Sequence, residues 1–305
     1  MTNREGNSMG VLLDKLLEKR LLLSDGAWGT MLQDRGLRPG ECPELWNLEY
    51  PDRVREVAEA YLAAGSDMIL SNTFGGCRYK LKKFGLADRV AEINRAGARI
   101  SVEAAGDRAV AAASIGSTGE FLEPYGDIGE EEMAEAFREQ IKALIEGGVR
   151  ALCIETMTAI EEATLAVRVA KEVDPGLDVI CTMTFDPGPN GFRTMMGVDC
   201  QRAAEELVEA GTDILGANCG NGMEQMIRLM RDYRAVTDFP LAVHANAGIP
   251  ELVDGKTIFR ESPESMAAGV AKLVANGAVI IGGCCGANPA HIRAMGKELR
   301  RLRGK

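Results

Sequence analysis

A nine-residue pattern occurs four times in this chain and constrains its fold more than any other feature. Each copy begins with glycine, continues as a short apolar run, and reaches a polar or metal-capable residue seven positions after the glycine. The copies are residues 65–73, 148–156, 211–219 and 277–285. A glycine at that place is typical of a helix C-terminal cap, and the β-rich run is typical of a strand buried on both faces. The pattern therefore predicts strands that each follow a helix.

Four further apolar runs lie in the gaps between these copies. They end at Asp25, near Ser114 and Gly116, near Thr184 and Asp186, and at Asn246. Amphipathic segments at 51–64, 131–147 and 200–210 alternate with the runs. Eight alternating units predict an α/β fold, a (βα)8 TIM barrel spanning residues 1–305 as a single domain, with residues 1–10 flexible. A doubly wound open sheet is the alternative fold. It is less favoured because a pattern that repeats at alternate strands favours a closed barrel.

Composition narrows the class of protein. The chain is 46% hydrophobic and 26% charged, and its net charge of −10 argues against nucleic acid as the main partner. Its polar start does not resemble a signal peptide, and no apolar run approaches the roughly 20 residues of a membrane span. We therefore expect a cytoplasmic protein without a membrane partner. The eight cysteines are too few for a disulfide scaffold and are expected to be reduced.

Three of these cysteines follow strands that are far apart in the sequence. Cys219 follows the sixth predicted strand, and the adjacent Cys284 and Cys285 follow the eighth. In a (βα)8 barrel the carboxyl ends of all strands meet at one mouth, so the three thiols should converge there. Three thiolates on fixed elements form a zinc site with one open position, which is the arrangement of a catalytic zinc. The trio is thus the predicted metal-binding and catalytic group.

The remaining candidates have simpler interpretations. We expect Cys153 and Cys181 to pack inside strands, and Cys42, Cys77 and Cys200 to pack as well, although Cys77 lies in a strand-end loop near the predicted mouth. Either histidine could be a metal ligand, but His244 is expected inside the seventh strand, and His291 is expected at a helix start as a cap or surface residue. The eight strand ends carry no lysine, which argues against Schiff-base chemistry. A structural zinc in a non-catalytic, partner-binding barrel is an alternative, but it would want a fourth protein ligand.

These motifs resemble the homocysteine S-methyltransferase family from about Asp25 to Leu302, and the combination of NCG with GGCCG is highly specific. They are most similar to the N-terminal homocysteine-binding domain of cobalamin-dependent methionine synthase. The motifs are SDGAWGTML, SNTFGG, SIGSTGEFLEP, ETMT, MTFD, ANCG, NAGIPELVDGKTIF and GGCCGANPAHI.

The resemblance implies a zinc-dependent reaction in which the thiol of homocysteine takes the open zinc position, loses its proton and attacks an activated methyl group, giving methionine. The implied donor is a methylated corrinoid, either methylcobalamin or a corrinoid protein or module that docks over the mouth. A sulfonium donor such as S-methylmethionine, or another small thiol as acceptor, is the alternative. The chain ends at RLRGK soon after the last predicted helix, so it is either a fragment or a protein that meets its donor in trans.

Substrate-binding residues are expected at the other strand ends. Asp25 and Glu155 are candidates for the ammonium group of the acceptor, and the backbone N–H groups of Gly26 and Ala27 are candidates for its carboxylate. The resemblance maps Asp25, Gly26 and Glu155 onto substrate-binding positions. Further candidates, expected to orient loops or ligands, are Asn218 and Asn246 and, more weakly, Ser71, Asn72 and Thr73.

The chain departs from the family pattern at three places near the predicted mouth. The segment GNGMEQM follows Cys219, His244 and Ala245 precede NAG, and Trp28 stands where methionine is more common. The zinc chemistry should survive these changes, but they leave the identity of the acceptor thiol open.

Overall fold

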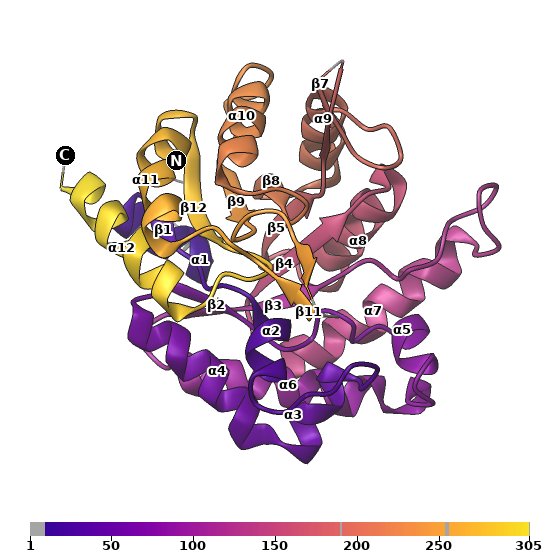
Figure 1. Cartoon of the computed structure of the whole chain (residues 1–305). Helices are drawn as coiled ribbons and strands as arrows, with labels where there is room; N and C mark the ends of the chain where they lie inside the picture. Colours follow the sequence, from indigo (N-terminus) through magenta and orange to yellow (C-terminus); the bar gives the residue numbers. More distant parts are fainter. Residues whose placement is uncertain (1–9, 190, 254–255, 305) are drawn as a thin grey trace.

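The fold is an eight-stranded parallel barrel inside a ring of helices (Figure 1). The computed structural model describes residues 10–189, 191–253 and 256–304. Of residues 1–10, which were predicted to be flexible, only Gly10 lies in the described part. The strand order is β1-β12-β9-β8-β5-β4-β3-β2. The strands are β1 Leu22–Leu23, β2 Met68–Leu70, β3 Val110–Ile115, β4 Ala151–Met157, β5 Asp178–Met183, β8 Ile214–Asn218, β9 Leu241–Ala245 and β12 Ala278–Gly283. The predicted barrel is confirmed.

Eight helices alternate with these strands and cover the outside of the barrel. They are α4 Pro51–Ala64, α6 Val90–Ala105, α7 Glu130–Glu146, α8 Ile160–Val173, α9 Cys200–Ala210, α10 Met223–Arg234, α11 Pro263–Ala275 and α12 Pro289–Arg303. Shorter helices precede the first strand or lie in the segments that connect the longer elements: α1 Val11–Lys19, α2 Trp28–Gln33, α3 Trp46–Glu49, α5 Arg78–Lys82, η1 Pro43–Leu45 and η2 Ala87–Arg89. The three predicted helical segments agree with α4, α7 and α9 to within one residue. Among the described helices none is long and apolar enough to cross a membrane, and a cytoplasmic location stays a prediction.

The four glycines of the repeat have the conformation that a helix cap requires. Their φ angles are 102° at Gly65, 103° at Gly148, 100° at Gly211 and 88° at Gly277. A side chain at such a φ angle is strained, so glycine ends each helix and lets the chain turn into the next strand. The recurring pattern is therefore the sequence signature of the α-to-β turn on the amino-terminal side of the barrel.

Two apolar layers hold the barrel together. The inner layer takes at least one side chain from each of the eight barrel strands, together with Leu12 from α1. The outer and larger layer lies between the strands and the ring of helices. Because Leu12 is fully buried in the inner layer, α1 closes the amino-terminal end of the barrel.

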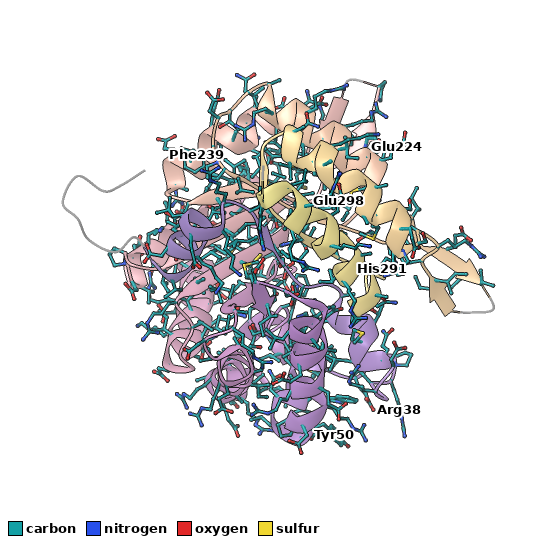
Figure 2. The ribbon with its side chains drawn as sticks, turned by 90° about the vertical axis from the view of Figure 1, so that its left-hand side faces the viewer. Arg38, Tyr50, Glu224, Phe239, His291 and Glu298 are labelled. Atoms are coloured by element: carbon teal, nitrogen blue, oxygen red, sulfur yellow. The ribbon has the colours of Figure 1, made fainter. Side chains whose placement is uncertain are left out.

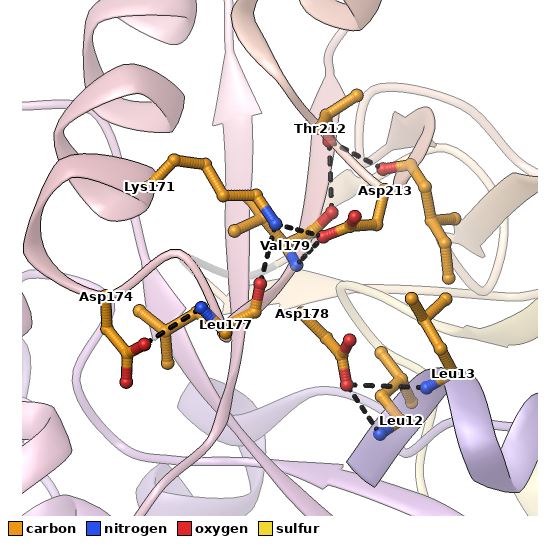
Figure 3. A network of polar contacts seen from close by, with 11 residues as sticks. Leu12, Leu13, Lys171, Asp174, Leu177, Asp178, Val179, Thr212 and Asp213 are labelled. Carbon is orange, nitrogen blue, oxygen red and sulfur yellow. Dashed lines mark hydrogen bonds and ion pairs between the residues drawn. The ribbon is translucent and has the colours of Figure 1, made fainter. Parts of the chain in front are cut away.

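The start of α1 is fixed to the sheet by a buried carboxylate (Figure 3). Asp178 accepts a hydrogen bond from the backbone N–H of Leu12 at 2.7 Å, which satisfies a donor at the start of the helix. Nearby, Lys171 on α8 pairs with Asp213, the residue before β8, at 2.6 Å, and Asp213 also accepts the N–H of Val179 at 2.8 Å. This end of the molecule is thus built for stability, and the mouth lies at the opposite end.

The seam between β1 and β2 is closed by aspartate side chains. Asp67 Oδ2 accepts the N–H of Leu23 at 2.9 Å, and the N–H of Asp67 donates to the carbonyl of Leu23 at 2.7 Å. Asp67 also pairs with Lys19 on α1 at 2.6 Å and with Arg303 on α12. On the mouth side, Asp25 Oδ2 accepts the N–H of Leu70 at 2.7 Å. Two carboxylates therefore complete a barrel whose seam strands are only two and three residues long.

Two β-hairpins at the mouth were not predicted. One pairs β6 (Asp186–Gly188) with β7 (Gly191–Arg193), and the other pairs β10 (Glu251–Val253) with β11 (Lys256–Ile258). The β10–β11 hairpin stands out from the barrel beside the labelled His291 at the start of α12 (Figure 2, pale orange at the right). Both hairpins contain turn-forming pairs in the sequence, Asn190-Gly191 and Asp254-Gly255, although residues 190, 254 and 255 lie outside the described part.

Replacing Asp67 should weaken the whole fold. Asp67→Ala removes the acceptor of the seam and leaves Lys19 and Arg303 without their buried partner, so we expect a loss of about 2–4 kcal/mol in the free energy of unfolding. Urea unfolding measures this loss. Asp238→Ala, which removes an exposed carboxylate, is the control and should change the free energy by less than about 0.5 kcal/mol. Equal effects of the two substitutions would contradict the account of the seam.

The effect of Asp67 should also depend on pH. Burial alone would raise the pKa of Asp67, but hydrogen bonds from Lys19, the N–H of Leu23 and Arg303 hold it below its usual value. A carboxylate with a lowered pKa stabilises the fold above its unfolded pKa of about 3.9 and loses that contribution as the pH falls further. The difference between the wild type and Asp67→Ala should therefore shrink below about pH 4.

Candidate functional site

The three predicted cysteines meet at the mouth of the barrel. Their sulfur atoms all lie within 4.8 Å of one another, and the Sγ atoms of Cys219 and Cys285 are 3.8 Å apart. A tetrahedral zinc with Zn–S bonds of about 2.3 Å has S–S edges of about 3.8 Å. The three thiols therefore fit a zinc ion with three sulfur ligands, and among the described residues this cluster contains no fourth ligand group.

The backbone fixes the three cysteines from several sides. The N–H of Cys219 donates to the carbonyl of His244 at 3.1 Å, and the N–H of Cys284 donates to the carbonyl of Ala245 at 2.7 Å. The carbonyl of Cys285 accepts the N–H of Ala247 at 2.9 Å. Cys219 has a φ of 62°, a left-handed conformation that costs a non-glycine residue of order 1 kcal/mol or more. The fold accepts this strain and holds the thiol of Cys219 at the mouth.

Hydrogen bonds among the thiols favour a shared negative charge. Donation from Cys284 and Cys285 lowers the pKa of Cys219 well below its usual value. The same interaction with Cys219 raises the pKa of both Cys284 and Cys285. The cluster alone thus stabilises one thiolate with two thiol donors, and a divalent cation is what would allow all three sulfurs to ionise.

Asn218 connects the thiols to the nearest carboxylate. Its Oδ1 accepts the N–H of Thr156 and the hydroxyl of Thr182, each at 2.8 Å. Its Nδ2 lies 3.4 Å from Oε2 of Glu155 and 3.9 Å from Sγ of Cys284. Asn218 is fully buried, so its amide has one fixed orientation between the two groups.

Asn246 also contacts the thiol of Cys219. Its backbone N–H donates to the carbonyl of Asn221 at 3.0 Å, and its side chain contributes a hydrogen bond that helps to lower the pKa of Cys219. Its Oδ1 is buried and has no hydrogen-bond partner among the described residues. The structure thus places both predicted asparagines against the cysteines, and their contact with substrate stays a prediction.

Glu155 and Asp25 are buried carboxyl groups whose charges interact. Glu155 is 8% exposed and accepts a hydrogen bond from the hydroxyl of Ser114; burial, partly offset by that bond, raises its pKa to about 7. Asp25 is 1% exposed, and burial raises its pKa to about 6 even though the N–H of Leu70 and the indole of Trp28 both donate to it. The charge of Asp25 raises the pKa of Glu155 further. Such a pair favours a cationic ligand between or beside the two groups.

The backbone N–H groups of Gly26 and Ala27, predicted to bind the substrate carboxylate, are not both free to do so. The N–H of Ala27 donates to the carbonyl of Ala287 at 2.9 Å, so this donor is already bonded within the chain. A Cβ on Gly26 would lie 2.3 Å from the same carbonyl, which explains the glycine by close packing of the loop after β1 against the loop after β12. A carboxylate role for these two residues stays a prediction, with one donor fewer.

The other sequence candidates lie where packing and capping need them. Cys42, Cys77, Cys153, Cys181 and Cys200 are all buried, and Cys77 is the N-cap of α5. His291 forms a capping box with Asn288, and its Nε2 lies 2.9 Å from the carbonyl of Glu261. Ser71, Asn72 and Thr73 hydrogen-bond within the loop after β2 and to its neighbours.

A second group of side chains lies below the mouth, and only one of its members, Glu155, was predicted as a site residue. Cys153, Glu155 and His244 bring ligand-capable atoms within 4.8 Å of one another, and all three are buried. Inward alternation along the fourth and seventh barrel strands is the signal that could have pointed to Cys153 and His244 as neighbours of Glu155. The contacts of Ser114 and Thr182, whose hydroxyls bond Glu155 and Asn218, were not predicted either.

Comparison with known proteins identifies the family of this chain. The family model described as homocysteine S-methyltransferase matches residues 22–299. Methionine synthase of Mycobacterium leprae is 27% identical over 304 residues, covering 93% of this chain and 25% of the relative. Methionine synthase of Mycobacterium tuberculosis is 26% identical over 309 residues, covering 96% and 26%. The chain therefore spans about a quarter of the length of these curated relatives.

Solved structures show the same fold. The homocysteine methyltransferase MmuM from Escherichia coli, in its metallated form, is 23% identical with a TM-score of 0.77, covering 93% of this chain and 98% of that one. Its oxidized form gives a TM-score of 0.78 and covers 95% and 99%. With a family match over nearly the whole barrel, the chain belongs to the homocysteine S-methyltransferase family, whose members are methyltransferases acting on a thiol.

Proposed function

We propose that this protein transfers a methyl group from a methylated corrinoid to the thiol of homocysteine, giving methionine. The observation that carries the proposal is the set of three sulfur atoms at the mouth, next to a buried carboxylate and without a fourth ligand among the described residues. Cys219, Cys284 and Cys285 would hold Zn²⁺, which when bound lowers the pKa of a thiol at its open position so that the thiolate forms at neutral pH. The metallated MmuM relative supports metal use.

The residues around the cysteines would bind and orient the acceptor. Glu155 and Asp25 would receive its ammonium group, and both are shielded from water, where a charge pair is strongest. Asn218 fixes Glu155 relative to Cys284, so the ammonium and the thiol would be held at a set separation. Asn246 would stabilise the thiolate form of Cys219 through its hydrogen bond.

The methyl donor is proposed from the relatives. Identity of 26–27% with methionine synthases favours a methylated corrinoid, presented by methylcobalamin or by a corrinoid protein or module. A sulfonium such as S-methylmethionine is the alternative donor. A structural zinc in a non-catalytic barrel is the alternative of another class, and the cluster of three ligands argues against it, since structural sites are usually closed by four.

Cysteine variants test the metal assignment. Cys219→Ser and Cys285→Ser should each lose most bound zinc and nearly all turnover, because a serine hydroxyl is a poor zinc ligand at neutral pH. Zinc content by elemental analysis and methionine formation are the measurements. Cys200→Ala, at a buried cysteine on α9, is the matched control and should keep both. Full zinc and activity in either serine variant would refute the assignment.

Glu155→Gln tests the acceptor pocket through two properties. We expect the KM for homocysteine to rise at least about tenfold with zinc still bound, because a buried charge-assisted contact is lost. We also expect the variant without substrate to be more stable at pH 8 by roughly 1–3 kcal/mol, because ionising a carboxyl whose pKa is raised costs stability as the pH rises towards and through 7. The gain should vanish near pH 4.5.

Steady-state kinetics and thermal unfolding at pH 5 and pH 8 measure these two effects. Glu161→Gln, at an exposed carboxylate on α8, should show neither of them. An unchanged KM would remove Glu155 from the substrate site.

A methyl-transfer assay distinguishes the donors. Zinc-loaded protein is mixed anaerobically with methylcobalamin and homocysteine, and the corrinoid spectrum is followed. We expect loss of the methylcobalamin spectrum together with methionine formation, and chelation of zinc should abolish both. Consumption of S-methylmethionine with methylcobalamin untouched would establish the sulfonium alternative instead.

A further inference from the structure

His244 points into the polar interior just below the mouth. One of its ring nitrogens lies within 4.8 Å of both the carboxylate of Glu155 and the sulfur of Cys153. The side chain is only 2% exposed, and a Cβ on Gly282 would lie 2.8 Å from its Cδ2, so the neighbouring strand β12 makes room for the ring with a glycine. The position of the ring is thus specified by the barrel and is not a consequence of a flexible loop.

The imidazole has an unused hydrogen-bonding atom. Its Nε2 is buried and has no hydrogen-bond partner among the residues that the structure describes. Leaving such a group unpaired costs about 1–3 kcal/mol, so it is expected where a ligand supplies the missing partner. Burial lowers the pKa of His244, which favours the neutral imidazole. In that form one ring nitrogen donates and the other accepts, and with the proton on Nδ1 the free Nε2 offers a lone pair to a donor.

The groups around His244 are mostly acceptors. Glu155 and Asp25 are buried carboxyl groups that sense each other's charge, and Ser114 is already bonded to Glu155. Lys80 on α5 also acts on Glu155 but contributes less than burial does. A ligand that brings several N–H donors and a positive charge would satisfy this pocket, and an alkylammonium group brings three such donors.

We propose that His244 is the third acceptor for the ammonium group of the substrate, beside Glu155 and Asp25, and that it makes the enzyme selective for amino thiols. This inference rests on the proposed function. It assigns a substrate-binding role to a residue that the sequence pattern placed only inside a strand. The order of groups, with Cys284 followed by Asn218, Glu155 and His244, matches a substrate that carries its thiol at one end and its ammonium at the other.

A metal ion among Cys153, Glu155 and His244 is a different reading of the same atoms. It would require the Cys153 thiol to ionise, and burial raises the pKa of that thiol well above its usual value. An ammonium ligand needs no ionisation of Cys153, so the pocket favours the ammonium. The experiment below separates the two through the number of zinc ions bound per chain.

The test compares the binding of two thiols to the zinc-loaded full chain. Homocysteine and 4-mercaptobutanoate differ only in the amino group, and calorimetry gives the Kd of each. His244→Phe should weaken homocysteine binding about tenfold and change 4-mercaptobutanoate binding by less than about twofold. His244→Gln keeps a side-chain acceptor and should restore most of the affinity. Cys181→Ala, at a buried position on strand β5, is the control and should change neither Kd.

The possible results lead to distinct conclusions. If His244→Phe weakens the binding of both thiols equally, or weakens the binding of neither, the role of His244 is overturned while the proposed function is left intact. A wild type that binds two zinc ions per chain, with one lost in His244→Phe, would overturn it in favour of the metal. If zinc-loaded wild type binds neither thiol, the proposed function itself fails and the inference falls with it.

Discussion

Closure of the barrel at its shortest strands depends on buried aspartates. β1 has two residues and β2 has three, too few for a ladder of backbone hydrogen bonds, and the carboxylates of Asp67 and Asp25 accept the N–H groups that a longer strand would have paired. Asp25 then belongs to two structures at once. Its side chain closes the seam, while its backbone carbonyl accepts the N–H of Gly283, the residue before Cys284. The seam therefore sets the position of the predicted zinc ligands.

The mouth is maintained at a cost to stability. Burial disfavours the charged forms of Glu155, Asp25 and His244. It raises the pKa of the two acids and lowers the pKa of the imidazole to about 4. Cys219 and Thr156 both have a φ of 62°, and both contact the hydrogen-bond network of Asn218 or the thiols. Strain and desolvation collected in one place are typical of a binding site. At the opposite end of the barrel burial also raises the pKa of Asp178, but the carboxylates serve the fold. There, Asp178 and Asp213 are used for capping and pairing.

Much of this arrangement can be predicted from the sequence because it follows local rules. Glycine at positions 65, 148, 211 and 277 is required by a left-handed cap, and an apolar run after such a glycine is a strand, so the convergence of Cys219, Cys284 and Cys285 follows from topology alone. Contacts between distant strands do not follow from local rules. The N–H of Ala27, which was predicted to bind the substrate carboxylate, donates to the carbonyl of Ala287 instead. The approach of His244 to Glu155 depends on the barrel radius. The two hairpins were missed because their turn pairs lie within long loops.

The central claim is an open metal site that accepts the thiol of the substrate. Zinc K-edge X-ray absorption on the zinc-loaded protein, with and without homocysteine, tests it most directly. The account predicts a shell of about three sulfur atoms near 2.3 Å plus one lighter atom, changing to four sulfur atoms when homocysteine is added. A shell of four protein ligands that homocysteine leaves unchanged would contradict the account and would indicate a structural zinc.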